Sequence, residues 1–236
     1  MMGIEKELNT ASVKTYHQQT KHYPDRPARS VGYMDWENQP VPFRSFSDAK
    51  EIKLPLIEKD PGLPYYALYG INAVAPISLF SISTLLSLSM GLSAWKKYGG
   101  SEWALRINPS SGNLHPTECY ILLPGFSHSP ATLTHYHPYL HVLQETAVFN
   151  QQQNASFNAL GGFGIILTSI TWREAWKYGE RAFRYCNHDA GHALAALGFS
   201  AALKGWKLTC LNGLSDDDTE SLLGFERTAW EPLEAE

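Results

Sequence analysis

The sequence predicts a chain that contains both helices and strands. Residues 161–170 predict a buried strand, because an apolar run follows a glycine pair. Residues 172–204 predict a long helical stretch, broken near Gly179. At 236 residues with 44% hydrophobic content, the chain suits one large or two small domains. The net charge of −4 gives no reason to expect nucleic acid or an acidic membrane surface.

The first 60 residues are polar, rich in proline and without clear periodicity. They predict an arm that lies across the surface, held by aromatic side chains such as Trp36 and Phe43. Residues 61–236 are then the main domain.

A stretch from Pro61 to Trp95 contains no charged residue. Within it, residues 77–97 predict a helix that starts after Pro76 and ends at Gly99-Gly100. Frequent serines interrupt its apolar residues, so a buried or interface helix is favoured over a membrane span.

Shorter elements follow from local patterns. They are a short strand at 104–107, a helix-to-strand passage at 117–123, a hairpin arm at 132–143, a short helix or loop at 149–158, a strand at 206–211, and a helix at 216–223 capped by Ser215.

The cysteine content indicates whether the protein occupies a reducing or an oxidising cellular compartment. The three cysteines are few, odd in number and widely spaced, which is not typical of a disulfide framework. No cationic start is followed by an apolar run, so no signal peptide is expected. These features predict a reducing, cytoplasmic location.

The helical stretch contains a candidate base. Arg173 and Arg181 flank Lys177 at four residues on either side, and two like charges at that reach disfavour a protonated amine. An amine with a lowered pKa beside the phenol of Tyr178 could remove a proton from carbon. Spacing alone equally allows a solvated charged face, in which Glu174 and Glu180 pair with the basic residues.

The loop from Arg106 to Pro116 is a candidate binding loop. Gly112 allows a close approach of the backbone to a ligand, and the neighbouring side chains offer hydrogen bonds and one cation. The residues concerned are Arg106, Pro109, Ser110, Ser111, Gly112 and Asn113. An ordinary turn would have the same composition.

Cys186, His188, Asp189 and His192 form a candidate metal site. The two histidines are four residues apart, but the glutamate of a zincin helix is absent and no third ligand is evident. No metal is therefore predicted.

Together, these motifs resemble the nitroreductase superfamily, and more narrowly the SagB-type dehydrogenases that oxidise thiazolines and oxazolines in modified peptides with FMN. The resemblance is carried by Arg-x-x-Pro-Ser-Ser-Gly at 106–112, the Gly-Gly strand, Lys-Tyr-Gly-Glu-Arg-Ala-Phe-Arg-Tyr at 177–185 and the following Asp-Ala-Gly-His-Ala. It implies an α+β fold with a mixed, mostly antiparallel sheet wrapped by helices.

The resemblance also implies a site and a partner. Two such units would join to form paired FMN sites, either as a homodimer or with a second nitroreductase-like half. The loop at 109–113 would lie against the flavin, Lys177 and Tyr178 would act as the base, and hydride would pass through flavin N5. An NAD(P)H-dependent reductase of nitro or quinone compounds belongs to the same class.

Two departures from the family pattern affect these expectations. The segment 68–76 lacks the arginines that usually grip the FMN phosphate, which leaves Arg106, Arg181, Arg184 and Lys207 as candidates. The sequence also ends before a further strand, so the chain is expected to be truncated or half of a tandem protein. Both departures favour, as an alternative, a non-catalytic half that completes another unit's flavin site.

Overall fold

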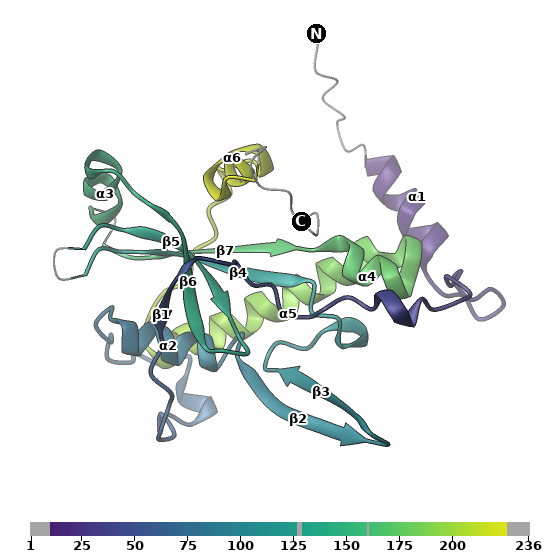
Figure 1. Cartoon of the computed structure of the whole chain (residues 1–236), viewed down its shortest axis with the longest axis horizontal. Coiled ribbons are helices and arrows are strands. Elements are labelled where there is room, and N and C mark those ends of the chain that lie inside the picture. The colour runs from purple at the N-terminus through teal and green to yellow at the C-terminus, as the bar shows by residue number, and fades with distance from the viewer. Residues whose placement is uncertain (1–9, 127–128, 160, 226–236) are drawn as a thin grey trace, which may run out of the picture.

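A five-stranded sheet forms the centre of the chain in a computed structural model that describes residues 10–126, 129–159 and 161–225 (Figure 1). Its strands are β1 (Lys50–Lys53), β4 (Thr117–Leu123), β5 (Thr132–His137), β6 (Val142–Val148) and β7 (Gly164–Ser169), in the order β1-β6-β5-β4-β7. All four neighbouring pairs are antiparallel.

The strands β2 (Leu92–Tyr98) and β3 (Ser101–Arg106) form a separate hairpin that projects from the body (Figure 1). The helices are α1 (Thr10–Thr20), α2 (Leu79–Ser87), α3 (Gln151–Asn158), α4 (Thr171–Tyr178), α5 (Ala182–Leu203) and α6 (Asp216–Leu223). Four single turns of 3-10 helix are η1 (Trp36–Asn38), η2 (Tyr65–Ala67), η3 (Ser111–Asn113) and η4 (Gly179–Arg181).

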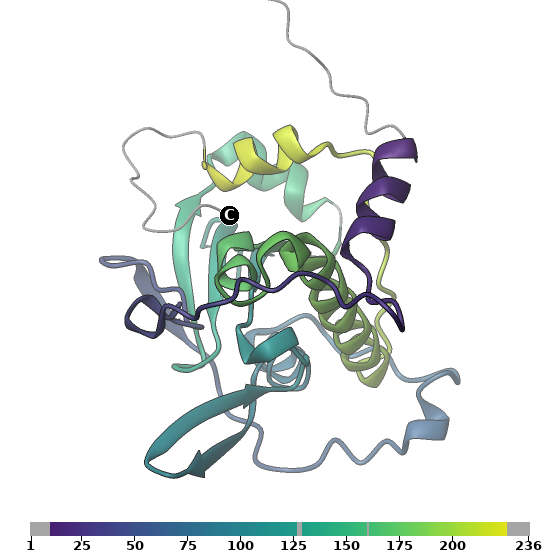
Figure 2. The same cartoon turned by 90° about the vertical axis from the view of Figure 1, so that its right-hand side faces the viewer.

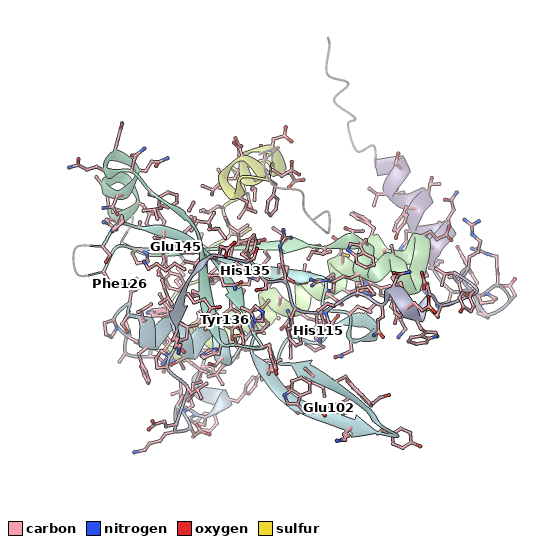
Figure 3. All side chains as sticks on the ribbon, viewed as in Figure 1. Glu102, His115, Phe126, His135, Tyr136 and Glu145 are labelled. Carbon is pink, nitrogen blue, oxygen red and sulfur yellow. The ribbon has the colours of Figure 1, made fainter. Side chains whose placement is uncertain are left out.

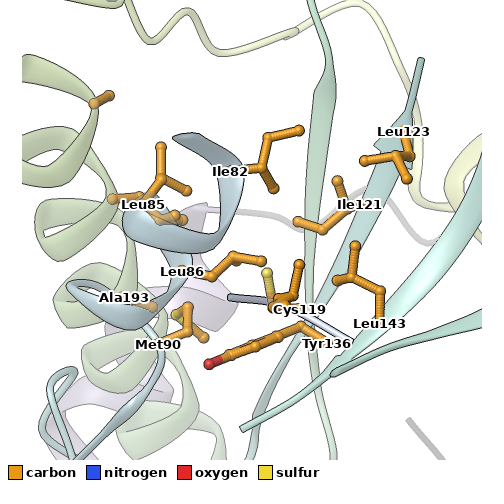
Figure 4. Close-up of a cluster of buried hydrophobic side chains, with 13 residues drawn as sticks. Ile82, Leu85, Leu86, Met90, Cys119, Ile121, Leu123, Tyr136, Leu143 and Ala193 are labelled. Atoms are coloured by element: carbon orange, nitrogen blue, oxygen red, sulfur yellow. The ribbon is translucent and has the colours of Figure 1, made fainter. Parts of the chain in front are cut away.

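Both faces of the sheet are covered because its strands alternate side chains between two apolar clusters. Cys119 and Ile121 of β4 pack with α2 and α5 in the larger cluster, which Figure 4 shows. Tyr120, between them, joins the smaller cluster on the opposite face with Leu223 of α6. An α+β architecture with an antiparallel sheet wrapped by helices is therefore confirmed.

Several elements lie where the sequence predicts them. Ser215 caps α6 through its side chain, which accepts a hydrogen bond from the backbone N–H of Asp218. The strand predicted at 161–170 is β7, and the helical stretch 172–204 is interrupted at Gly179, where φ is 52° and ψ is −126°.

The predicted helix at 77–97 is wrong in its second half, because α2 ends at Ser87 and β2 begins at Leu92. Gly91 permits this reversal, since a Cβ atom there would lie 2.7 Å from the carbonyl oxygen of Ser87. Gly99 and Gly100 do not end a helix. Both have positive φ, as the two-residue turn between β2 and β3 requires.

Two further predictions are wrong. Residues 117–123 are strand throughout, since β4 pairs with β5 on one side and with β7 on the other. Residues 206–211 form no strand, because Trp206 is hydrogen-bonded outside any sheet. Its backbone N–H donates to the Ala201 carbonyl at the end of α5, and its indole N–H donates to the Ala75 carbonyl. The hairpin predicted at 132–143 is confirmed, but it lies within the sheet as β5 and β6.

The N-terminal segment is more structured than its composition suggests. Residues 10–20 form α1, the chain then runs along α4 and α5 (Figure 2), and residues 50–53 join the sheet as its edge strand β1. Among the residues described, no helix is both long and apolar enough to cross a membrane.

Candidate functional site

The loop between β3 and β4 is fastened to α5 by one buried carboxylate. Asp189 accepts hydrogen bonds from the Ser110 hydroxyl at 2.7 Å, from the Ser111 hydroxyl at 3.0 Å, and from the Ser111 N–H at 3.0 and 3.1 Å. The imidazole Nδ1 of His192 lies 3.2 Å from the Pro109 carbonyl oxygen. Loop residues 109–111 are thus fixed to a rigid helix.

The backbone of this loop is unusual. Gly112, Asn113 and His115 all have positive φ, at 63°, 61° and 51°. The last two are held there by side-chain bonds, since Asn113 donates to the Ala104 carbonyl at 2.9 Å and its Oδ1 lies 3.0 Å from His115 Nε2. Non-glycine residues with positive φ cost free energy, and they are found most often at functional sites.

Gly112 brings the loop against the helix that contains the candidate base. A Cβ atom on Gly112 would lie 2.8 Å from the Tyr178 hydroxyl and 3.1 Å from Lys177 Nζ. Only glycine fits at this distance. The two motifs, which are about 65 residues apart in the sequence, therefore meet in one place.

Tyr178 is the last residue of α4, and its side chain is half-buried. Its ring centroid lies 4.3 Å from that of Tyr185 on α5. Burial, together with the neighbouring Glu174 carboxyl, raises the pKa of Tyr178 above its ordinary value. Tyr178 is consequently a neutral phenol near pH 7, able to donate a hydrogen bond.

Glu174, one turn before Tyr178, is fully buried, and neither of its carboxyl oxygens has a hydrogen-bond partner. Burial and the charge of Asp189 raise its pKa to about 8, although Lys177 opposes the shift. Glu180 is exposed and pairs with Arg29. A solvated face in which Glu174 and Glu180 pair with the basic residues of the helix is therefore excluded.

A buried ionic network lies next to this site. Arg173 Nη1 donates to Glu118 Oε1 at 2.6 Å and to the His115 carbonyl at 2.8 Å, and Glu118 Oε2 lies 2.7 Å from His135 Nε2. Burial alone would raise the pKa of Glu118, but the hydrogen bond from His135 and the surrounding positive charges outweigh it and hold the pKa at about 2. Figure 3 labels His115 and His135, which lie near the middle of the molecule.

The side chain of Arg106 is buried and is not exposed on the loop between β3 and β4. Its guanidinium is buried, donates to the backbone carbonyls of Pro42 and Thr117, and stacks 5.4 Å from the centroid of the Phe43 ring. Burial lowers the pKa of Arg106 to about 10, so the group remains charged. These contacts tie β3 to the N-terminal segment.

Arg181 and Arg184 also contact the N-terminal segment. Arg184 donates to the His17 carbonyl at 3.1 Å and to the Thr20 hydroxyl at 2.8 Å, whereas Arg181 Nη1 contacts the imidazole of His22. All three predicted phosphate arginines therefore contact other parts of the chain, whereas Lys207 is exposed. Lys177 and Tyr178 lie against the loop at Gly112, but the arginines as they lie do not fit a phosphate.

The sequence does not predict the roles of two residues of this site. It indicates Asp189 only as a candidate metal ligand and Glu174 only as a surface charge. Asp189 lies four residues after Tyr185 on the same helix, so a helical projection could have placed it toward the serine loop. No local signal marks Glu174, because its burial depends on how α4 packs against α5.

The antiparallel sheet, the helices on both of its faces and the serine loop packed on a long helix together define a nitroreductase-type α+β fold. The chain is similar to the crystal structure of a putative nitroreductase from Anabaena variabilis, with a TM-score of 0.69 and 29% identity over 89% of the chain. It spans 42% of that protein's length. The expected resemblance to the nitroreductase superfamily is thereby confirmed.

A more distant solved structure has the same fold. It is the E. coli microcin synthetase McbBCD complex with truncated pro-MccB17 bound, with a TM-score of 0.50 and 19% identity over 91% of this chain and 86% of that one. No family model and no curated protein matches the sequence. Both solved structures therefore support the same nitroreductase-like fold for this chain.

Proposed function

We propose that the chain is an FMN-dependent oxidoreductase in which Lys177 and Tyr178 handle a proton. The observation that carries this proposal is the contact of Gly112 with both side chains, where a Cβ atom would lie 2.8 Å from the phenol oxygen and 3.1 Å from the amine. This contact brings the loop at 109–113, which is expected to lie against the flavin, next to Lys177 and Tyr178, which are expected to act as the base.

The cofactor is proposed because the chain is similar in fold to a putative nitroreductase, and because the loop at 109–113 meets Lys177 and Tyr178 at Gly112. When bound, FMN would supply the hydride chemistry at its N5 atom. The backbone at 110–113 would lie along its ring, and the clamp by Asp189 would keep that backbone in place. The exposed Lys207 is the remaining candidate for its phosphate, unless a second unit supplies a cation.

The proton would be moved by this chain's own side chains. Lys177 Nζ, in its unprotonated form, would accept a proton from a substrate carbon, and the neutral Tyr178 hydroxyl would hold a substrate oxygen or nitrogen by donating to it. Their close packing against Gly112 would fix both groups relative to the loop.

The proposed substrate is a thiazoline or oxazoline in a modified peptide. The resemblance to SagB-type dehydrogenases supports this substrate, as does the likeness in fold to the microcin synthetase complex with truncated pro-MccB17 bound. A reductase of nitro or quinone compounds that uses NAD(P)H is a second candidate, favoured by the likeness to the putative nitroreductase from Anabaena variabilis.

Replacing the base tests the proposal. Lys177→Ala in the FMN-reconstituted protein is expected to lower turnover of a thiazoline-containing peptide, or of menadione with NADPH, about a hundredfold or more. The flavin content should stay unchanged. Tyr178→Phe tests the phenol separately, and equal turnover in the wild type and both variants would remove the assignment.

A non-catalytic half that pairs with another nitroreductase-like unit is the alternative. One observation in its favour is that the chain spans 42% of the length of the Anabaena protein. The other is an exposed apolar surface formed by Tyr65, Tyr66, Tyr69, Ile71 and Phe199. This alternative predicts self-association by light scattering and no flavin retained by the separated chain. A monomer that retains FMN at high concentration would eliminate it.

A further inference from the structure

Two arginines at the start of α5 face two histidines of the N-terminal segment, which runs along α4 and α5 (Figure 2). Arg181 Nη1 contacts the imidazole Nε2 of His22, and Arg184 Nη1 lies 3.3 Å from the imidazole Nδ1 of His17. Arg184 also donates to the His17 carbonyl and to the Thr20 hydroxyl. Within the described residues, these partners of the two guanidiniums include no carboxylate.

The positive charge of Arg181 and Arg184 is therefore not neutralised locally. Arg29 and Arg173 each pair with a glutamate, and Glu180, the residue next to Arg181, is the partner of Arg29. The Nε atoms of Arg181 and Arg184 are buried and have no hydrogen-bond partner within the described chain. Buried donors of charged groups cost free energy when they lack an acceptor, and an anion would supply one.

His22 indicates where such an anion would lie. The backbone N–H of Ala28 donates to His22 Nδ1 at 3.0 Å, so a neutral imidazole carries its proton on Nε2. This N–H faces the N–H groups of Arg181, and two donors meet without an acceptor between them. A protonated ring would oppose the Ala28 N–H as well. An anion placed between His22 and Arg181 would accept hydrogen bonds from both.

The donors suit a phosphate group better than a carboxylate. Arg181 and Arg184 are three residues apart at the start of a helix, a spacing that makes side chains neighbours. Guanidinium groups bind phosphate oxygens through pairs of N–H bonds, and two of them balance a charge close to two negative units. With the His22 N–H, three side chains face three terminal oxygens, whereas a carboxylate has only two.

We propose that Arg181, Arg184 and His22 form a binding site for a phosphate monoester, shared between α5 and the N-terminal segment. As the chain lies, the direct contact of Arg181 with His22 fills this place, and the exposed His22 ring turns aside to admit the phosphate. The Arg181 guanidinium lies 4.9 Å from the centroid of the Tyr185 ring, whose centroid lies 4.3 Å from that of Tyr178. The site is thus next to the candidate active site, and it does not depend on the proposed flavin chemistry.

Calorimetric titration with inorganic phosphate at pH 8 tests the site, with sodium chloride at the same ionic strength as the blank. The wild type should bind one phosphate per chain. Arg181→Gln should weaken binding by about tenfold or more, because a charge-assisted hydrogen bond is lost. His22→Ala changes an exposed side chain and should keep the fold while weakening binding by about threefold or more.

The matched control is Arg29→Gln, which removes the same charge from the N-terminal segment at a residue that pairs with Glu180. It should change the affinity for phosphate by less than about threefold, since solvent and salt screen an exposed charge. A wild type that binds no phosphate, equal losses in Arg29→Gln and Arg181→Gln, or unchanged affinity in His22→Ala would overturn the site.

Pairs of ligands that differ by one phosphate identify its source. FMN is compared with riboflavin, and NADPH with NADH, in the wild type and in Arg181→Gln. The pair whose phosphorylated member loses its advantage in the variant contains the natural ligand, and discrimination of neither pair assigns the site to the free ion. A chain that binds inorganic phosphate but has no oxidoreductase activity would contradict the proposed function and leave the phosphate site in place.

Discussion

Replacing Glu174 with glutamine should make the protein more stable in alkaline solution. The carboxyl is fully buried without a hydrogen bond, and its pKa is raised from 4.5 to about 8. The folded state therefore keeps the proton at pH values where the unfolded state has lost it. As the pH rises from about 4.5 to about 8, the free energy of unfolding of the wild type falls.

The size of the effect follows from the two pKa values. At about 1.36 kcal/mol per pKa unit, a rise from 4.5 to about 8 corresponds to roughly 5 kcal/mol. Glutamine cannot ionise, so Glu174→Gln should match the wild type near pH 4.5 and exceed its free energy of unfolding by about 4–5 kcal/mol at pH 9.

Urea unfolding monitored by tryptophan fluorescence at pH 4.5, 6, 7.5 and 9 measures this difference, with Glu102→Gln as the control for loss of a surface charge. The slope m should remain the same in both proteins, so that the midpoints report stability. A difference that does not change with pH would show that Glu174 is not held in its neutral form, and would refute the reasoning.

Three further changes probe the same region. Asp189→Asn should cost about 2–3 kcal/mol and expose the loop at 109–113 to limited proteolysis, because a charged acceptor of hydrogen bonds from two serines is lost. Glu118→Gln should cost about 3–5 kcal/mol in urea unfolding, since Arg173 would remain charged and buried. The cost should shrink as the pH falls from about 4.5 toward 2, where the wild-type carboxylate is itself protonated. Gly112→Ala should lower stability by about 1–2 kcal/mol and reduce turnover, because φ is 63° and the Cβ would collide with the Tyr178 hydroxyl. Gly191→Ala, on the open face of α5 with no atom within 4 Å of the new Cβ, should instead be neutral or stabilising by up to about 1 kcal/mol. Unchanged unfolding and proteolysis in the first two variants, or equal losses in both glycine variants, would contradict these accounts.

Elements with strong local signals were predictable from the sequence. Ser215 followed by three aspartates predicts a capped helix start, and α6 begins at Asp216. Gly179 after Tyr178 predicts the interruption between α4 and α5, and its positive φ is the reason. In these cases the deciding interaction lies within a few residues of the chain.

Elements decided by distant contacts were not predictable in the same way. The apolar run after Ser87 looks helical because its periodicity continues, but the close approach of Gly91 to α2 turns the chain into β2. Trp206 begins a strand-like pattern, but it is bonded to α5 and to Ala75 instead of a sheet edge.

The candidate site likewise contains residues that the sequence predicts and residues whose role depends on distant contacts. The serine loop and the Lys177–Tyr178 pair were recognisable as motifs, and the structure brings them together at Gly112. The anchoring role of Asp189 and the burial of Glu174 depend on the packing of α4, α5 and the loop. Residue type and spacing do not encode that packing locally.

Flavin binding tests the central proposal most directly. The purified chain, incubated with excess FMN and then gel-filtered, should retain flavin absorbance at close to one FMN per chain. Gly112→Ala, whose Cβ would disturb the loop beside Tyr178, should retain less. A wild-type chain that elutes without flavin absorbance at any FMN concentration would contradict the proposal that it forms its own flavin site.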